Sequence, residues 1–318
     1  VVSVTESQIT VKSPNILSDT IKVKVAVQGS YIYSNIMEYK LVPALWEFGG
    51  FDEYSDAYAI ACDSDENLYV STKGKKVYKV TPDGEKTIYS EDSGFDKASG
   101  MKMGPGGYLY FVNILSYMFR IPPGGGKYEM YIVLPGGGFD LDFGPNGNLF
   151  CGGNKNALYR VKPDKTKDVV ADYTDIYIKS IRVYNGYVYV AGEYTGTDAE
   201  AVQMGVWRNQ ILADDGTVGE KELVLDWASQ FNGYLISINF SEDGDMYVGT
   251  DEPEGIIIFH EDGSYEGLYP GVIEPESYAL CWGNEEFLYV TRRGAEPTQK
   301  RIMKVNAQKN GAPYYGRL

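Results

Sequence analysis

Cysteine is scarce in this chain of 318 residues, which contains only Cys62, Cys151 and Cys281. Their odd number and wide spacing exclude the framework of a small disulfide-rich fold. There is no Cys-X-X-Cys motif and no cluster of cysteine with histidine, so a structural zinc site is excluded as well. All three cysteines stand in apolar, strand-like stretches, and the sequence therefore predicts buried free thiols.

Histidine is scarcer still, with His260 as the single example. Catalytic arrangements of the Ser-His-Asp and Cys-His kinds need an imidazole base beside the nucleophile. His260 stands in "IIIFHEDG", where an apolar strand pattern ends in a turn. The sequence therefore disfavours both triad hydrolases and lyases that use a histidine base.

Three further absences narrow the class of protein. The formal net charge is −15, so the basic surface that nucleic-acid phosphates require is missing. No run of about 18 apolar residues occurs, and no transmembrane span is predicted. The opening stretch, "VVSVTESQITVKSP", lacks the charged and apolar regions of a signal peptide.

Helical stretches rich in Ala, Leu and Glu are also missing, whereas 37 Gly and 28 Tyr are present. This composition favours an all-β protein with many turns. With 43% hydrophobic residues, a chain of this length can bury a sizeable core.

One short strand-like motif returns six times along the chain. Aligned on their central aromatic residues, the copies stand 41, 40, 39, 58 and 42 residues apart. A period near forty, with strands and turns inside each unit, is typical of a β-propeller. The copies are "NLYVST" at Asn67, "YLYFVN" at Tyr108, "NLFCGG" at Asn148, "YVYVAG" at Tyr187, "DMYVGT" at Asp245 and "FLYVTR" at Phe287.

A second motif, "VYKV" at Val77, repeats behind each copy as a third strand. The turn "PDG" at Pro82 follows it, with Gly suited to a positive φ. We therefore predict a propeller of six four-stranded blades over residues 43–318. The interval of 58 is attributed mostly to an insertion, "EYTGTDAEAVQM", between the second and third strands of the fourth blade. The first blade is predicted to have strands at Tyr58–Asp63, Asn67–Thr72, Lys76–Thr81 and Lys86–Ser90.

A ring of blades must close, because an open edge strand invites aggregation. The sixth blade supplies only three strands of its own, the last of which ends near Val305. The stretch "LWEFGGFDEYSDAYAIA" resembles "TIYSEDSGFDKASGMKM", where a fourth strand leads into the next blade. We therefore predict that Ala44–Phe48 is the outer strand of the sixth blade and that Tyr314–Leu318 is a docked tail.

Residues 1–42 do not follow the blade pattern. The stretches "SQITVKSP", "IKVKVAVQG" and "YSNIMEYKL" alternate as the strands of a β-sandwich do. Together with a turn at Gly29, they resemble the C-terminal part of an IPT/TIG immunoglobulin-like domain. Half a sandwich cannot bury its core, so we expect the native chain to extend upstream of Val1.

The blades in turn resemble those of NHL-type propellers, through the pattern "NLYV…VYKVTPDG". An IPT/TIG module followed by such a propeller is similar to a group of surface proteins of gut Bacteroidetes. This resemblance implies a lipid anchor upstream of Val1 and a location that is extracellular, at the outer-membrane surface or periplasmic. It also implies a setting near polysaccharide-handling systems.

Charged residues recur at one position of the predicted innermost strands. Lys102, Asp142 and Arg182 fall on consecutive blades, and we predict them at one height, with Asp142 within ion-pair reach of a cation. Two interpretations stay open. The charges form an ion-pair chain between blades, because unpaired buried charges are costly, or they line a channel that grips an anion or a sugar. The full set of six is Ala61, Lys102, Asp142, Arg182, Asn239 and Cys281.

The loops that enter the first strands share one face with the loops between second and third strands. They carry aromatic residues beside acids, amides and arginines, which suits sugar rings, because aromatic faces stack on C–H groups and polar groups bind hydroxyls. Ordinary loop packing in a Tyr-rich chain is the alternative. The candidate ligand-binding residues are Tyr117, Glu193, Tyr194, Trp227, Tyr234, Asp251, Arg292 and Arg293.

The sequence favours a non-catalytic exported protein, without a cofactor, that binds a glycan or another surface protein at the propeller mouth. A purely structural surface module is a further interpretation. The enzymatic alternative is a metal-assisted lactonase- or lyase-like propeller. Lactonase propellers, which share a loosely similar blade, hold a divalent cation between Glu, Asn and Asp, and this resemblance implies a cation such as calcium. The candidate ligands here are Asp140, Asp142, Glu193 and Asn239.

Overall fold

The computed structural model describes residues 3–5, 8–10, 18–52, 54–154, 157–294 and 300–317. The chain divides into two compact units, Val1–Ala44 and Leu45–Leu318. The predicted strand in "SQITVKSP" lies largely outside the described residues.

The first unit contains two antiparallel hairpins. β1 (Ser3–Val4) pairs with β2 (Ile9–Thr10), and β3 (Ser18–Val23) pairs with β4 (Met37–Leu41). Apolar side chains between β3 and β4 are exposed, with Tyr31 at 100% and Ile32 at 80%. None of the unit's residues for which burial is described is buried, so these hairpins form no core by themselves.

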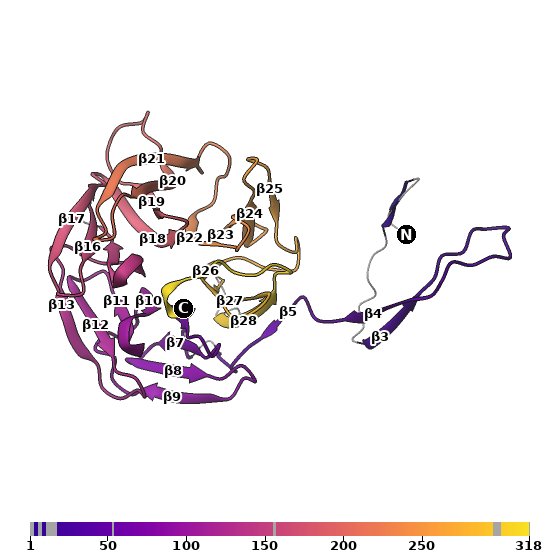
Figure 1. Ribbon diagram of the computed structural model, residues 1–318, viewed down its shortest axis with the longest axis horizontal. Coiled ribbons are helices and arrows are strands. Elements are labelled where there is room, and N and C mark those ends of the chain that lie inside the picture. The colour runs from indigo at the N-terminus through magenta and orange to yellow at the C-terminus, as the bar shows by residue number, and fades with distance from the viewer. Residues whose placement is uncertain are drawn as a thin grey trace. The chain divides into compact units, whose positions relative to one another are not determined.

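The second unit is a ring of six four-stranded antiparallel sheets, counted over the described residues (Figure 1). In each of the first five sheets, the strands follow chain order from the innermost to the outermost. The all-β, six-bladed propeller that the sequence predicts is confirmed.

The strand bounds of blades 1 to 3 stay close to those expected from the repeat. Short 3-10 turns, η1 (Pro105–Gly107) and η2 (Pro145–Gly147), join first and second strands in blades 2 and 3. Blade 1 consists of β6 (Ile60–Cys62), β7 (Leu68–Thr72), β8 (Lys76–Val80) and β9 (Lys86–Ser90). Blade 2 consists of β10 (Gly100–Met103), β11 (Leu109–Val112), β12 (Tyr117–Ile121) and β13 (Glu129–Val133). Blade 3 consists of β14 (Asp140–Phe143), β15 (Leu149–Gly152), β16 (Ala157–Val161) and β17 (Lys167–Asp172).

Blades 4 to 6 vary more in strand length. Blade 4 consists of β18 (Ile176–Tyr184), β19 (Tyr187–Tyr194), β20 (Met204–Ile211) and β21 (Val218–Asp226). Blade 5 consists of β22 (Leu235–Phe240), β23 (Met246–Thr250), β24 (Ile256–Phe259) and β25 (Tyr265–Gly267). Blade 6 consists of β26 (Ser277–Trp282), β27 (Phe287–Arg293), β28 (Lys300–Asn306) and β5 (Leu45–Glu47).

The extra length of blade 4 has a different origin from the one predicted. Its strands have eight or nine residues each, against three to seven in the other blades. The loop between β19 and β20 covers only residues 195–203, and Glu193 and Tyr194 belong to β19. Longer strands therefore account for much of the irregular interval that the sequence analysis assigned mostly to one insertion.

Packing between blades explains why the second strands are buried along their length. Six apolar clusters occur among the described residues, and each joins two neighbouring blades. Between blades 3 and 4, for example, Phe150 and Leu158 pack with Ile178 and Val190. Because each sheet is covered on both faces, the inner strands are fixed around a common axis.

The ring closes with the pairing that the sequence predicts. β5 lies antiparallel to β28, with Glu47 opposite Met303 and Leu45 opposite Val305. An ion pair between Glu47 and Arg301 links the same two strands. The outer edge of blade 6 is thus covered by a strand from the beginning of the ring.

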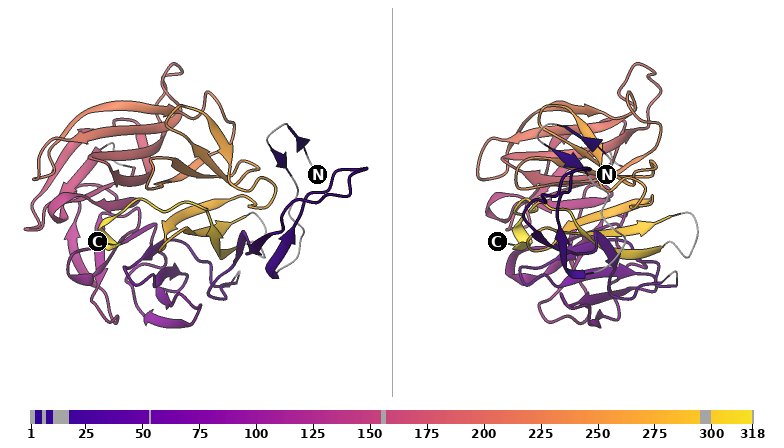
Figure 2. Two further views of the ribbon diagram at one scale, coloured as in Figure 1. Left: turned by 45° about the vertical axis from the view of Figure 1, so that its right-hand side comes forward. Right: turned by 90° about the vertical axis from the view of Figure 1, so that its right-hand side faces the viewer.

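The chain ends at the centre of the ring (Figure 1), at one of its two faces (Figure 2). The tail that precedes η4 (Tyr315–Arg317) is held by a bond from the Ala312 N–H to the Phe240 carbonyl, at 3.0 Å. The Tyr314 hydroxyl donates to the Trp282 carbonyl at 2.8 Å. The face that carries this tail and the loops between first and second strands is called the lower face, and the opposite one the upper face.

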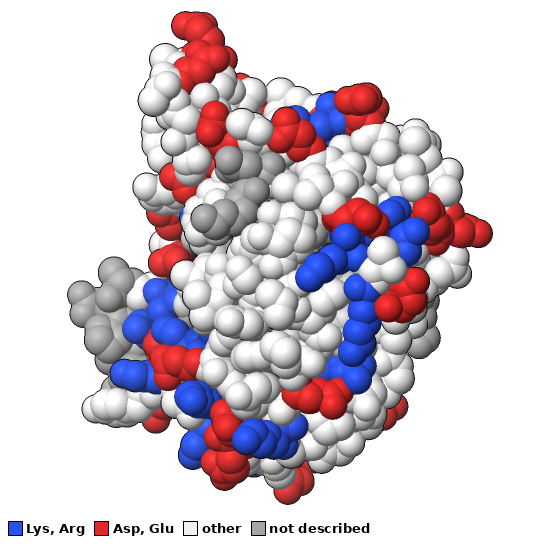
Figure 3. Space-filling model, turned by 90° about the vertical axis from the view of Figure 1, so that its left-hand side faces the viewer, with Lys and Arg blue, Asp and Glu red and all other residues white. Residues whose placement is uncertain are grey.

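Charges of both signs are interspersed on the outer side of the ring. On the side of β13 and β17, Lys and Arg lie beside Asp and Glu (Figure 3). Pairs of this kind include Arg160 with Asp168, at 2.9 Å. In the part of the chain that the structure describes, no helix is long and apolar enough to cross a membrane.

Candidate binding site at the upper mouth

The inner strands bring a buried ion pair to the axis of the ring. Arg182 Nη1 lies 2.7 Å from Asp140 Oδ2, and less than a tenth of the arginine side chain is exposed. Burial alone would lower the pKa of Arg182. The charges of Asp140 and Asp142 outweigh this effect, so that the pKa lies above its ordinary value. The same carboxylate oxygen accepts from the Ile181 N–H at 2.9 Å and the Ser180 hydroxyl at 3.2 Å. Asp140 therefore joins blade 3 to blade 4.

Asp142 has another role than the one predicted. Its two carboxylate oxygens accept hydrogen bonds from the backbone N–H groups of Val183, at 2.8 Å, and Phe143, at 3.0 Å. Among the described residues no ion pair of Asp142 within 4.0 Å is present, and Asp140 is the direct partner of Arg182. The sequence pattern located the charged level but chose the wrong carboxylate as the ion-pair partner.

Asn239 and Lys102, the other polar candidates of the inner ring, are also buried. The Asn239 amide donates to the Leu280 carbonyl at 3.0 Å, which ties blade 5 to blade 6. Lys102 Nζ lies 5.4 Å from the centre of the Tyr314 ring, at the lower end of the axis. Many of the polar groups that the sequence analysis assigned to a channel are therefore occupied by contacts within the protein.

A small cavity of about 20 Å³ remains at the upper end of the axis, bounded by all six inner strands or the loops entering them. Arg182 and Lys179 line it, together with Ser237 and Tyr278. Arg182 Nε and the Ser237 hydroxyl are buried with no hydrogen-bond partner among the described residues. The space suits about one water molecule, so a larger ligand must bind above it.

A cluster of cations surrounds one carboxylate at this mouth. Asp56 lies 2.6 Å from Lys97, 3.2 Å from Arg293 and 3.4 Å from Lys300. Burial alone would raise the pKa of Asp56, but hydrogen bonding and charge from Lys97, then the other two cations, lower it. The Tyr58 ring lies 4.9 Å from Lys97 Nζ and 4.3 Å from the Arg293 guanidinium carbon. The sequence analysis selected Arg293 but missed Asp56, Lys97 and Lys300.

A hollow of about 260 Å³ lies at the upper ends of blades 4 and 5, and it is called the rim pocket here. It brings together four of the predicted residues, Glu193, Tyr194, Trp227 and Tyr234. Tyr234 is 55% exposed, whereas Trp227 is fully buried. The complete lining is Glu193, Tyr194, Gln203, Met204, Trp227, Ala228, Phe231, Asn232, Gly233 and Tyr234.

Trp227 is therefore part of the core and not a rim aromatic, which corrects the prediction. Its ring stacks on Phe231 with centroids 4.3 Å apart. Its indole N–H donates to the Gly233 carbonyl at 2.7 Å, which fixes the loop that carries Tyr234. Trp227 supports the pocket from beneath, and Tyr234 is the aromatic side chain that a ligand can reach.

The charge of Glu193 connects the rim pocket with the axis. Glu193 Oε2 lies 3.4 Å from Lys179 Nζ, and Lys179 lines the axial cavity. The same ammonium lies 4.0 Å from the centre of the Tyr177 ring. The Tyr194 hydroxyl accepts from the Asp198 N–H at 3.2 Å, so the loop after β19 packs on this tyrosine.

The three remaining candidates do not line the rim pocket. The Asp251 carboxylate accepts from the Tyr234 N–H at 2.5 Å and thereby positions the loop. Arg292 forms an ion pair with Glu274. Tyr117 begins β12 in blade 2 and is 45% exposed. Gln203 and Asn232, which the sequence analysis missed, take their place as polar lining, and neither stands in a repeated position.

The four candidate metal ligands each have partners within the protein. No cluster of three or more His, Cys, Asp or Glu residues that could hold a metal is present in the described residues. Asp140 is paired with Arg182, and Asp142 with backbone N–H groups. Glu193 is paired with Lys179, and the Asn239 oxygen accepts from the Phe240 N–H at 2.9 Å. At least one oxygen of each candidate thus has a positive or N–H partner, which differs from the free carboxylate set that calcium prefers.

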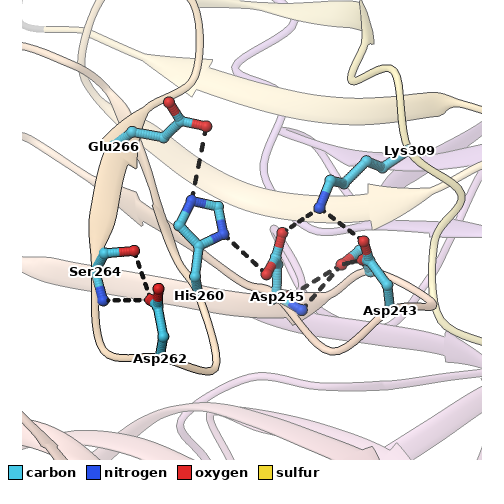
Figure 4. A network of polar contacts seen from close by, with 8 residues as sticks. Asp243, Asp245, His260, Asp262, Ser264, Glu266 and Lys309 are labelled. Carbon is cyan, nitrogen blue, oxygen red and sulfur yellow. Dashed lines mark hydrogen bonds and ion pairs between the residues drawn. The ribbon is translucent and has the colours of Figure 1, made fainter.

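His260 follows β24, the third strand of blade 5, and therefore lies on the lower face. Figure 4 shows its ring between Asp245 and Glu266. Its Nδ1 is 2.9 Å from Asp245 Oδ1, and its Nε2 is 3.7 Å from Glu266 Oε1. Lys309 bonds Asp245 and lies 2.7 Å from Asp243 Oδ2. These contacts connect blade 5 to the C-terminal segment, so the histidine belongs to a network on the face opposite the rim pocket.

Comparisons with known proteins identify the fold. No protein-family model matches the chain, and no curated protein matches it. Solved structures, in contrast, do match the chain. A gluconolactonase from Xanthomonas campestris is similar with a TM-score of 0.60 and 13% identity, over 80% of this chain and 88% of that one. Regucalcin, a calcium-binding protein from Agrobacterium tumefaciens, is similar with a TM-score of 0.64 and 14% identity, over 83% of this chain and 94% of that one.

A catalytically inactive variant of virginiamycin B lyase from Staphylococcus aureus, solved with quinupristin, gives a TM-score of 0.57 and 16% identity. The match covers 92% of this chain and 93% of the lyase. Identities this low show a shared six-bladed fold and leave the chemistry of the mouth to this chain's own residues.

Proposed function

We propose that this protein is a non-catalytic binding propeller whose upper mouth takes a carbohydrate with an acidic group. The observation that carries the proposal is the rim pocket of about 260 Å³, in which Tyr194 and Tyr234 stand beside Glu193, Gln203 and Asn232. Aromatic faces and hydrogen-bonding groups around one hollow are what a sugar ring needs.

The preference for an acidic sugar rests on charge. Three cations surround the carboxylate of Asp56, in a chain whose formal net charge is −15. Lys179 adds a further cation between the rim pocket and the axial cavity. Positive groups gathered at the mouth of an acidic protein attract an anionic ligand and orient it. A carboxylate on a sugar held in the rim pocket could compete with Glu193 for the Lys179 ammonium.

The test is a glycan array that contains neutral and uronate-bearing oligosaccharides, followed by titration calorimetry with the strongest binder. Replacement of Tyr234 by Ala should weaken binding by roughly thirtyfold, since a stacking aromatic is worth about 2 kcal/mol. Tyr117→Ala is the matched control, because Tyr117 is similarly exposed but does not line the rim pocket. Equal losses in both variants, or selection of neutral glycans alone, would overturn the proposal.

Metal-assisted lactonase or lyase activity is the second candidate function. The comparisons favour it over simple binding, because the structures of a gluconolactonase, a regucalcin and a virginiamycin B lyase share the fold. The residues at the mouth favour binding, because the carboxylates are paired and the one histidine lies on the other face. Lactone hydrolysis should be assayed with calcium, with zinc and with chelator. Metal-dependent turnover that Asp140→Asn abolishes would replace the binding proposal with the enzymatic one.

An exported or cell-surface setting is part of the same proposal. It is supported by the resemblance of residues 1–42 to an IPT/TIG module and of the blades to NHL propellers, as in surface proteins of gut Bacteroidetes. A surface glycan or a neighbouring surface protein would then be the partner. Protease accessibility of the native protein on intact cells tests this setting, and full protection in the cytoplasmic fraction would contradict it.

A further inference from the structure

Two of the three cysteines meet at the seam where the ring closes. Cys62 ends β6 of blade 1 and Cys281 lies in β26 of blade 6, and these innermost strands approach within 8 Å between Cα atoms. Both side chains belong to one buried apolar cluster, and each influences the pKa of the other. No disulfide joins them in this structure.

The tail at the lower face covers this pair. The Tyr314 hydroxyl is 3.8 Å from Cys281 Sγ and 3.5 Å from the Cys62 carbonyl oxygen. A hollow of about 650 Å³ lies beside the tail and is lined by Tyr314, Tyr315 and Pro313. Displacement of Tyr314 would open a path to the thiols from the lower face.

The surroundings of the two sulfur atoms are unequal. The interaction with Cys62 and the nearby charge of Lys102 outweigh burial and lower the pKa of Cys281. Tyr314 and Arg182 act in the same direction. Burial, followed by the interaction with Cys281, raises the pKa of Cys62. Cys281 is thus the more easily ionised of the two, which is the order expected of an attacking and a resolving cysteine.

We propose that Cys62 and Cys281 are a redox-active pair, which forms a disulfide across the closing seam when a small-molecule or protein disulfide serves as oxidant. The Cys281 thiolate attacks one sulfur of the oxidant, the S–S bond of the oxidant breaks, and one thiolate leaves. Cys62 loses its proton to solvent and attacks the Cys281 sulfur, which releases the second thiolate. The two cysteines are oxidised by two electrons, and the oxidant leaves as two thiols after it takes up two protons.

Such a disulfide would cross-link blade 1 to blade 6, two neighbouring blades that come from opposite ends of the ring sequence. Residues 62 and 281 are 219 positions apart (281 − 62), so the bond would close a very long loop. Long loops lose the most unfolded-state entropy on cross-linking. The same seam is packed by the apolar cluster between blades 6 and 1, and Lys304 of blade 6 pairs there with Glu66 of blade 1 at 2.9 Å.

Cys151 provides a matched control within the same chain. It is fully buried in the cluster between blades 2 and 3, and burial alone raises the pKa of its thiol. It shares no cluster with another cysteine among the described residues. If buried thiols were oxidised in general, Cys151 would be oxidised as well. Oxidation through the proposed pair would leave Cys151 as a free thiol.

The experiment incubates the native full chain with oxidised glutathione and follows free thiols by alkylation and mass spectrometry. We expect the loss of two of the three thiols, a cross-linked peptide that contains Cys62 and Cys281, and a rise in Tm of roughly 5 °C or more. Cys151→Ser should behave like the wild type, and dithiothreitol should reverse the change. Cys62→Ser should stop at a glutathione adduct on Cys281.

Peptide mapping of the wild-type chain keeps the proposal testable even if a variant fails to fold. Three free thiols after oxidation, a stable glutathione adduct without the cross-link, or a cross-link that includes Cys151 would each overturn the proposal.

Discussion

The two mouths of the ring are built from opposite ends of the same six inner strands, yet different groups occupy them. At the upper end lie the Asp140–Arg182 ion pair and Lys179, around a cavity of about 20 Å³. At the lower end the tail with Tyr314 packs against the inner strands, beside a hollow of about 650 Å³. The repeat fixes the strands, whereas the loops and the tail decide which groups stand at each end.

At the upper mouth, polar residues that hold the blades together can be told apart from those that a ligand can reach. The deepest charges of the upper mouth, Asp140 and Arg182, are almost fully buried and join two blades. Tyr234 and Glu193 lie higher, at the rim, and are partly exposed. Substitutions at the deep level should therefore change stability, and substitutions at the rim should change binding.

The largest effect is expected from Asp140→Ala. The substitution leaves the buried Arg182 guanidinium without its carboxylate, which costs roughly 3–5 kcal/mol in a buried pair. Asp142→Ala should cost less, about 1–3 kcal/mol, because its direct partners are backbone N–H groups and its charge acts on Arg182 without a direct ion pair. Urea unfolding followed by tryptophan fluorescence measures both changes in the free energy of unfolding. A larger loss for Asp142 than for Asp140 would contradict this assignment of the ion pair.

A smaller loss is expected at the lower mouth from Tyr314→Ala. The variant removes the hydrogen bond to the Trp282 carbonyl and the ring that faces Lys102, for a loss of about 2 kcal/mol. Tyr54→Ala is the control, since Tyr54 is 82% exposed and should change stability by no more than about 0.5 kcal/mol. Equal stabilities of the two variants would show that the tail does not support the ring.

The periodic part of the fold could be predicted from the sequence because each blade repeats the same buried pattern. The aromatic at Tyr69 and its five equivalents, together with the turn at Gly84, locate strands without any knowledge of their neighbours. Closure by Leu45–Glu47 was accessible for the same reason, since the flanking "GFD" repeats a blade junction.

The site was less accessible, because its contacts join residues that no period relates. Asp140 and Asp142 share one strand, and only the spacing between blades decides which of them faces Arg182. Trp227 looks like a rim aromatic in a loop sequence, yet its ring finds Phe231 and the core behind it. Three cations converge on Asp56: Lys97 from the loop that enters blade 2, and Arg293 and Lys300 from the ends of β27 and β28 in blade 6. No local sequence pattern indicates this contact.

The cation cluster at the upper mouth should give a distinct dependence on pH. The pKa of Asp56 is lowered from its ordinary value of 3.8, so its contribution to stability is complete above that value and is lost as pH falls through the lower, folded-state pKa. Wild type should thus exceed Asp56→Asn in stability at pH 6. The difference should shrink below about pH 4.

Urea unfolding of both proteins from pH 6 to pH 2 measures that difference. Subtraction of the variant removes the contributions of the other carboxylates, which the two proteins share. A difference that stays constant across the whole range would mean that the folded-state pKa of Asp56 is not lowered by Lys97, Arg293 and Lys300.

The smallest effect on stability is expected from Tyr234→Ala at the rim pocket. Because this side chain is 55% exposed, the free energy of unfolding should change by no more than about 0.5 kcal/mol. Affinity for an acidic glycan should nevertheless fall by roughly thirtyfold. Thermal unfolding and calorimetric titration of the same preparation compare the two quantities directly. A variant that loses stability and affinity together would place Tyr234 with Trp227 in the core, and the rim would then have no aromatic side chain reserved for a ligand.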